Sequence, residues 1–440
     1  MHAVQTPRWR GDVTPDSLAG QSSGRRSSLR PTVLLAFAFW LMLWGGYNTG
    51  IYVLLAPNFP TGPVELFHGL RCLLPILAAW LAGLLLLRAE NPLAHRVIAG
   101  PLGLLAFYTL IGLVSSGLSR QPIQALYWAA TYGSVLIVLW AIASDADPAS
   151  TLSSLLTLNW VIAAAIMVGL LAAIPFLGDQ ALARTEGSPF GVVPYRGGFA
   201  ASGQILGMAS TRNTGFARYA AVTGLAALGR LWQGKTRARF IWAAVLLVSL
   251  YSLVLSQGRT QVVAFIVGAF VLLWLQRARR LVFVAGTVAA SILMGLTGFQ
   301  QVLWKYLTRL QEFDPTLTGR TETWRRGWEL FQQSPWIGLG FQADRFFLEG
   351  KHMHDALFHA LVQAGLLGTL AFVGAYVVMW FLVVRVYVAC PAQDLASLAA
   401  EVPGVLAFFT ISSVTESTFA FFGAAWLLTA PVLAYLQVEA

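Results

Sequence analysis

The chain has 440 residues, of which 57% are hydrophobic and only 11% are charged, with a mean hydropathy of +0.66. One soluble core could not bury this much apolar surface, so the composition predicts a polytopic membrane protein and excludes an ordinary soluble domain. The net charge of +10 does not indicate nucleic-acid binding, because the basic residues are dispersed among apolar segments. The two cysteines, Cys72 and Cys390, are predicted near opposite faces of the membrane, which excludes a disulfide between them.

Residues 1–30 are polar and rich in arginine, which predicts a disordered cytoplasmic tail and not a cleaved signal peptide. The apolar runs that follow are roughly 18 to 25 residues long, enough to cross a bilayer as helices. They fall near residues 32–56, 65–88, 97–118, 122–143, 151–177, 213–230, 239–256, 260–276, 281–298, 355–388, 397–413 and 418–437. The sequence thus predicts an all-α polytopic integral membrane protein of about twelve helices, nine within 31–298 and three within 355–440.

The short loops indicate how these helices are oriented. Loops that would lie on the side of the N-terminal tail carry arginines, among them Arg88, Arg96, Arg230 and Arg385. By the positive-inside rule that side is cytoplasmic, and both termini are predicted to lie there. The opposite face receives a shorter segment, 178–212, and a long loop, 299–354, and long loops on a compact scaffold commonly carry function.

Within the long loop, residues 321–333 predict an amphipathic helix that ends before Pro335. Its aromatic residues Trp324, Trp328 and Phe331 share one face, so we expect the helix to lie on the membrane surface.

The segment His352-Met353-His354-Asp355 lies at the mouth of the next predicted membrane helix. Titratable groups at that depth are usually functional, and an imidazole can take a proton from a hydroxyl near neutral pH. We predict His354 as the general base and keep His352 as a second candidate, with Asp355 able to orient the imidazole. Alternatively, His354 caps the helix or hydrogen-bonds Asp355; His359 is interpreted as a packed polar residue.

Several arginines fall on the outer face, which the inside bias does not explain. Arg218 lies inside its predicted span and Arg259 lies in the turn Ser256–Thr260. A guanidinium at such a place needs an anionic partner, and its planar fork suits phosphate oxygens. The predicted phosphate-binding residues are Arg259, Arg320, Arg218 and Arg212, with Trp324 and Arg196 as acceptor contacts. The alternative at each arginine is snorkelling or pairing with an acidic residue.

Two further patterns carry less weight. Asp145-Ala-Asp147 lies in a short cytoplasmic loop and is interpreted as a turn before a helix. Gly338-Leu-Gly340 lacks the strand and third glycine of a nucleotide fold, so it also predicts a turn. No cluster with convincing ligand spacing is visible, and we expect neither a metal nor another cofactor.

Four motifs together give the chain a family resemblance: Ser-x-Gly-Arg at 256–259, Gly-Arg-x-x-x-Trp at 319–324, Pro-x-x-Gly-x-Gly at 335–340, and the His354–Gly368 segment. The chain resembles the O-antigen ligase and polymerase superfamily of bacterial envelope glycosyltransferases, most closely the lipopolysaccharide O-antigen ligases. It departs from the family at Asp355, where asparagine is common, and at Gln363, where glutamate is common.

The resemblance implies a multi-pass protein of the bacterial inner membrane with its active site facing the periplasm. It implies a metal-independent, inverting transfer of O-antigen from undecaprenyl pyrophosphate to a sugar hydroxyl of the lipid A-core. Arg259 and Arg320 would hold the pyrophosphate, and His354 or His352 would be the base. An O-antigen polymerase and a protein O-oligosaccharyltransferase share this donor chemistry and stay open as alternatives. A lipid-linked glycan transporter is more distant, because its charges would continue across the full membrane depth.

Overall fold

The computed structural model describes residues 62–87, 99–145, 147–177, 182–184, 191–194, 212–231, 236–275, 320–348, 352–388 and 398–440, with isolated positions within 35–42 and 284–306. The predicted tail 1–30, most of the predicted helices 32–56 and 281–298, Cys390 and Arg196 lie outside the described residues. Described residues are almost all helical, as expected for apolar segments that must satisfy their backbone polar groups internally.

The helices of the first half of the chain carry proline in their first turn. Proline is favoured in a first turn because its fixed φ suits the helix and its missing N–H has no partner to lose there. The elements are α3 (Pro63–Leu70), α4 (Leu74–Leu86), α6 (Pro101–Ser115), α7 (Pro122–Ala143), α8 (Pro148–Leu177) and the strands β1 (Leu182–Arg184) and β2 (Val192–Pro194). The two strands pair antiparallel, Leu182 opposite Pro194. The described residues agree with the prediction of an all-α membrane protein, apart from this short ribbon, which lies inside the predicted loop 178–212.

The second half of the chain adds eight described helices, which lie before, within and after the predicted long loop. These are α10 (Asn213–Arg230), α11 (Thr236–Ser256), α12 (Arg259–Leu275), α15 (Arg320–Gln333), α16 (Ala343–Phe347), α17 (Ala356–Val383), α18 (Val402–Ser412) and α19 (Ala424–Glu439). A π-helical turn, Val384–Val388, extends α17. The predicted loop helix over 321–333 is confirmed as α15, and the predicted spans 122–143 and 213–230 coincide with α7 and α10.

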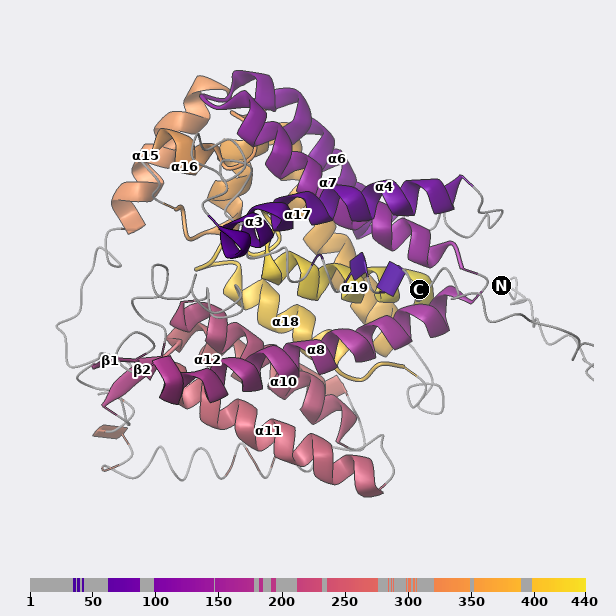
Figure 1. The fold of residues 1–440 in the computed structure, drawn as a ribbon, viewed down its shortest axis with the longest axis vertical. Coiled ribbons are helices and arrows are strands. Elements are labelled where there is room, and N and C mark those ends of the chain that lie inside the picture. The colour runs from indigo at the N-terminus through magenta and orange to yellow at the C-terminus, as the bar shows by residue number, and fades with distance from the viewer. Residues whose placement is uncertain are drawn as a thin grey trace, which may run out of the picture.

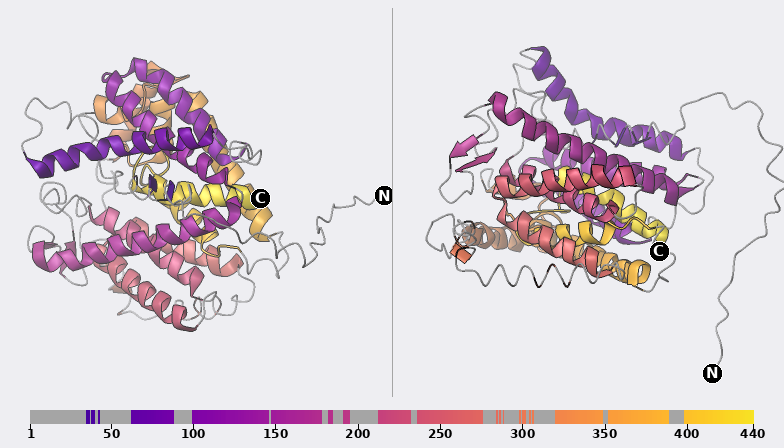
Figure 2. Two further views of the ribbon diagram at one scale, coloured as in Figure 1. Left: turned by 45° about the vertical axis from the view of Figure 1, so that its right-hand side comes forward. Right: turned by 90° about the horizontal axis from the view of Figure 1, so that it is seen from below.

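The helices form two groups with α18 and α19 between them. In one group α6 packs along α17 and α4 along α7; in the other α10 packs against α8, α11 and α12. The strands β1 and β2 and the helix α15 lie at the left of Figure 1, at the end opposite residue 440, and the right-hand view of Figure 2 agrees. The described parts of the two long segments predicted to share one face thus lie at one end of the assembly.

Five helices in the described part of the chain are long and apolar enough to cross a membrane. They cover Pro101–Leu118, Pro122–Ala143, Pro148–Leu177, Ala238–Ser256 and Ala356–Val388. Shorter apolar helices add Arg71–Leu86, Arg259–Leu275, Val402–Ser412 and Ala424–Glu439. The chain is a multi-pass membrane protein, while the count of twelve helices and their orientation stay predictions.

The helix α17 is broken at Gly365, which has φ 59° and ψ −162°. The segment Pro335–Gly340 crosses this break and supplies the hydrogen bonds that the helix loses there. Its backbone bonds are Leu339 N to Val362 O (2.8 Å), Gly340 N to Gln363 O (2.9 Å), Leu366 N to Pro335 O (2.7 Å) and Leu367 N to Trp336 O (3.1 Å). Non-helical backbone is tolerated within an apolar span when protein buries it and satisfies its polar groups.

Glycine makes this crossing possible. Gly338 and Gly340 have φ of 75° and 90°, which confirms the predicted turn, and a Cβ at Gly338 would lie 2.4 Å from the carbonyl carbon of Gln363. A Cβ at Gly365 would similarly lie 2.4 Å from the carbonyl carbon of Trp336. Two glycine motifs far apart in the sequence therefore pack backbone to backbone.

Candidate functional site

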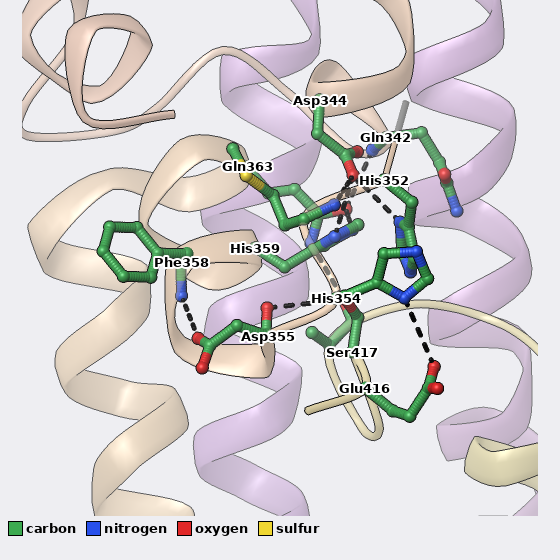
Figure 3. Close-up of polar contacts among 12 residues, drawn as sticks. Gln342, Asp344, His352, His354, Asp355, Phe358, His359, Gln363, Glu416 and Ser417 are labelled. Atoms are coloured by element: carbon green, nitrogen blue, oxygen red, sulfur yellow. Dashed lines mark hydrogen bonds and ion pairs between the residues drawn. The ribbon is translucent and has the colours of Figure 1, made fainter. Parts of the chain in front are cut away.

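The predicted base, His354, lies immediately before α17 and faces Glu416 (Figure 3). Its Nδ1 is 3.7 Å from Oε2 of Glu416, which comes from the loop between α18 and α19. The His354 side chain is 35% exposed, so it is accessible to a substrate. Burial alone would raise the pKa of Glu416, but His354 and the positive charge of Arg218 outweigh burial and lower that pKa. Glu416 is therefore ionised at neutral pH.

The second candidate, His352, lies deeper and belongs to a different group. Its Nδ1 is 3.0 Å from Oδ2 of Asp344, and Nδ1 of His359 is 3.2 Å from the same oxygen. Asp344 and His359 have no exposed side-chain surface, and His352 retains 13%. Burial lowers the pKa of His352 to about 4 despite the neighbouring carboxylate. The pKa of Asp344 is lowered well below its usual range, because His359 and His352 outweigh the opposing effect of burial.

Gln363, at the position where the family commonly has glutamate, joins the histidines to the helix core. Its Oε1 is 2.8 Å from Nε2 of His359 and accepts a hydrogen bond from the backbone N–H of Gln342 at 2.8 Å. Its Nε2 donates to the carbonyl of Ala420 at 2.8 Å and to the hydroxyl of Tyr108. Gln363 thus connects the 335–344 segment, α6 and the loop before α19 at one point. The packed role expected for His359 agrees with its place in this network.

Asp355 and Trp324 hold the histidine segment in place. Asp355 caps α17, because its Oδ1 accepts a hydrogen bond from the backbone N–H of Phe358 at 2.8 Å. The carboxylate that faces the His354 ring is that of Glu416, so the orienting role expected of Asp355 fits Glu416 better. Trp324 stacks on Phe358 with ring centroids 5.8 Å apart and donates from its indole nitrogen to the carbonyl of Met353 at 2.8 Å. Through Trp324, the helix α15 therefore contacts α17 at Phe358 and the backbone of Met353, the residue before His354.

Three of the four predicted phosphate-binding arginines lie at helix N-termini, and the fourth, Arg218, lies within α10. Arg212 precedes the first residue of α10 and Arg259 is the first residue of α12. The two ends meet, because the Asn213 side chain donates to the carbonyl of Ser256 at 3.2 Å, and a Cβ at Gly258 would lie 2.7 Å from that of Ala217. Arg320 is the first residue of α15.

These helix ends add a favourable field for an anion. Arg212 and Arg259 therefore stand where two helix N-termini place partial positive charge close together.

The O-antigen ligase family profile matches residues 243–373. Residues 243–373 are therefore similar to the O-antigen ligase family. The matched region includes Arg259, Arg320, His352 and His354, so it covers both candidate bases and two of the predicted phosphate-binding arginines.

The chain is also similar to the exopolysaccharide production protein ExoQ of Rhizobium meliloti, with 29% identity over 212 residues. This match covers 43% of the present chain and 47% of ExoQ, so it spans about half of each protein. Both findings support a membrane glycosyltransferase of the O-antigen ligase family.

Sequence reasoning missed two acidic residues of the site, one within the matched region 243–373 and one beyond it. Asp344 follows the Pro335–Gly340 turn by four residues, and its position in a loop predicted to be aqueous hid its burial. Glu416 lies between the last two predicted spans, 397–413 and 418–437. An acidic residue so close to two apolar spans was a usable signal, because ionisable residues at membrane depth are commonly functional.

Proposed function

We propose that this protein transfers a polysaccharide from undecaprenyl pyrophosphate to a sugar hydroxyl of the lipid A-core, at the periplasmic face of the bacterial inner membrane. The reaction is metal-independent and inverts the anomeric carbon. One observation carries this proposal: His354 faces the partly buried, ionised Glu416, which lies within the electrostatic influence of Arg218. A base and a cationic region are thereby neighbours at one end of the helix assembly.

His354 is the base in this mechanism. It takes the proton of the acceptor hydroxyl while the oxygen attacks the anomeric carbon of the donor sugar and the bond to the pyrophosphate breaks. Glu416 stabilises the imidazolium that results, since opposite charges at this distance favour the charged form. His352 suits the role less, because it is more deeply buried and its Nδ1 is already in contact with Asp344.

The arginines stabilise the leaving group. Undecaprenyl pyrophosphate departs as an anion, so guanidinium groups that neutralise its developing charge lower the barrier. Arg259 and Arg212 suit this role best, because they lie at the adjacent N-termini of α12 and α10 and can both bind phosphate oxygens. Arg218 lies about one and a half turns into α10 and connects their region to Glu416. Arg320 begins the helix that packs beside His354.

A second candidate function is polymerisation of a surface polysaccharide, in which the acceptor is another lipid-linked chain. The similarity to ExoQ favours it, because the name of that relative concerns exopolysaccharide production. The donor site would be the same in both reactions, and only the acceptor would differ.

Deletion of the gene separates these functions. Lipopolysaccharide from the deletion strain is run on a gel while undecaprenyl-linked glycan is extracted in parallel. A ligase predicts loss of the whole O-antigen ladder with accumulation of lipid-linked polymer. A polymerase predicts single repeat units on the core or loss of exopolysaccharide. An unchanged ladder and unchanged exopolysaccharide would contradict both and favour protein glycosylation or transport.

The site itself is tested by His354→Ala combined with Arg320→Ala in the complemented strain. We expect no transfer and normal amounts of inserted protein, because His354 precedes α17, Arg320 is the first residue of α15, and both lie outside the apolar spans. Arg325→Ala is the matched control, since Arg325 lies on the same helix, is exposed and pairs only with Glu322 and Glu329 among the described contacts. Full activity of a well-expressed double variant would exclude the proposed site.

A further inference from the structure

Asp344 contacts both His352 and His359 in the protein interior, and these contacts do not satisfy all of their buried polar atoms. Oδ2 of Asp344 lies 3.0 Å from Nδ1 of His352 and 3.2 Å from Nδ1 of His359, and the backbone N–H of Met353 donates to the same oxygen at 3.3 Å. Among the residues that the structure describes, the second oxygen, Oδ1, is buried without a hydrogen-bond partner, and so is Nδ1 of His359. Orphaned buried polar atoms are costly and call for an explanation.

The network around Gln363 determines which nitrogen of His359 carries a proton. The Gln363 amide has one orientation, because its Oε1 receives the backbone N–H of Gln342 and its Nε2 faces the carbonyl of Ala420. Nε2 of His359, 2.8 Å from that Oε1, must therefore be the donor. In neutral His359 this leaves a bare lone pair on Nδ1, pointing at a carboxylate oxygen of Asp344. Two acceptors in contact repel unless a positive charge lies between them.

The distances match those of a metal ligand set. A tetrahedral zinc ion bound at about 2.0–2.1 Å separates its ligand atoms by about 3.3 Å. The two Asp344–histidine separations are close to this value, and one atom from each of the three residues lies within 4.8 Å of the others. A histidine that binds a metal through one ring nitrogen usually donates a hydrogen bond from the other, which fixes its tautomer. The hydrogen bond from His359 to Gln363 is of this kind.

We propose that Asp344, His352 and His359 form a binding site for a divalent transition-metal ion of the zinc class. The two Nδ1 atoms and the two carboxylate oxygens supply up to four donor atoms, and Oδ1 thereby acquires a partner. Imidazole and carboxylate donors suit zinc better than calcium or magnesium, which prefer oxygen ligands alone.

The role of this ion is structural. Asp344 and His359 have no exposed surface, so the site is closed to substrate, as structural zinc sites are. The ion would fasten the segment that follows the Pro335–Gly340 turn to the first turn of α17, beside His354. The inference is independent of the proposed transfer reaction, which uses His354 and needs no metal.

The test measures metal binding by the full-length protein in detergent. The protein is purified without a histidine tag, stripped with EDTA, dialysed, and titrated with Zn²⁺ and separately with Co²⁺. We expect one equivalent of zinc by mass spectrometry, a visible absorption band of low-coordinate Co²⁺, and a melting temperature that falls on stripping and recovers with zinc. His359→Gln and His352→Gln should each weaken binding by more than about 10-fold.

His354→Gln is the matched control, because it removes a neighbouring imidazole that is not in the ligand set and should leave metal binding unchanged. A wild-type protein that gives no Co²⁺ band and no zinc-dependent melting shift would overturn the proposal without any variant. Binding that persists in His359→Gln and is lost in His354→Gln would overturn it too. In either case a proton on His359, forming a buried ion pair with Asp344, would hold the cluster together.

Discussion

Replacing Gly365 with alanine is expected to destabilise the protein strongly, because this glycine is where α17 breaks and the Pro335–Gly340 segment crosses. An L-residue at its φ of 59° costs about 1–2 kcal/mol. The new methyl group would also lie 2.4 Å from the carbonyl carbon of Trp336, 2.5 Å from the nitrogen of Ile337 and 2.6 Å from that of Gly338. No flexible side chain can relieve these contacts, so one backbone segment must move.

Four hydrogen bonds join the two segments at 2.7–3.1 Å, and each contributes about 0.5–1.5 kcal/mol net. Loss of two of them together with the strained φ gives a destabilisation of about 2–5 kcal/mol. Activity should fall with stability, since the same segment leads to Asp344.

The measurement is thermal unfolding of the purified protein in detergent, compared with Gly374→Ala. Gly374 lies on the same helix, but its added Cβ would meet only Leu104 Cδ1 at 3.5 Å, an ordinary van der Waals contact. That control should be neutral or slightly stabilising, because alanine is the better helix former. We expect Gly365→Ala to melt at least about 4 °C below the control. Equal melting temperatures would show that the break in α17 is not required by the fold.

Three further predictions concern charged groups. Arg259→Lys should raise the KM for the lipid-linked donor roughly tenfold, since an ammonium keeps the charge but loses the bidentate fork. An unchanged KM would show that the pyrophosphate does not bind at Arg259. The pKa of Glu416 is lowered from its usual 4.5, so its stabilising contribution is complete above that pH and lost as the pH falls through the lower value of the folded state. Glu416→Gln should therefore flatten the acid decline of the melting temperature below about pH 4.5 and slow transfer; an acid decline like that of the wild type would contradict the pairing with His354. Arg230→Met should cost about 3–5 kcal/mol, because Arg230 is 2.8 Å from the fully buried Glu401. Adding Glu401→Gln should recover part of that loss, and a double variant no more stable than the single one would contradict this account.

The amino-acid sequence by itself determined where most helices lie. The apolar runs 122–143 and 213–230 coincide with α7 and α10, because hydropathy and proline at the first turn are local signals that a membrane helix obeys. The same holds for α15, whose period and following Pro335 define it without reference to the rest of the chain. The importance of the His352–Asp355 segment was also visible, since imidazoles at a helix mouth are unusual in so apolar a chain.

Only the tertiary structure decided how these elements meet. The span 355–388 was predicted as one helix, and nothing local to Gly365 indicated that another segment would cross there and supply the missing hydrogen bonds. Asp344 lies eight and fifteen residues before His352 and His359, and Glu416 follows His354 by sixty-two, spacings that no single helix or turn imposes. Such contacts depend on packing between elements distant in sequence, and burial then sets the charge of each group. The sequence therefore indicates which residues are chemically capable, and packing decides which of them act together.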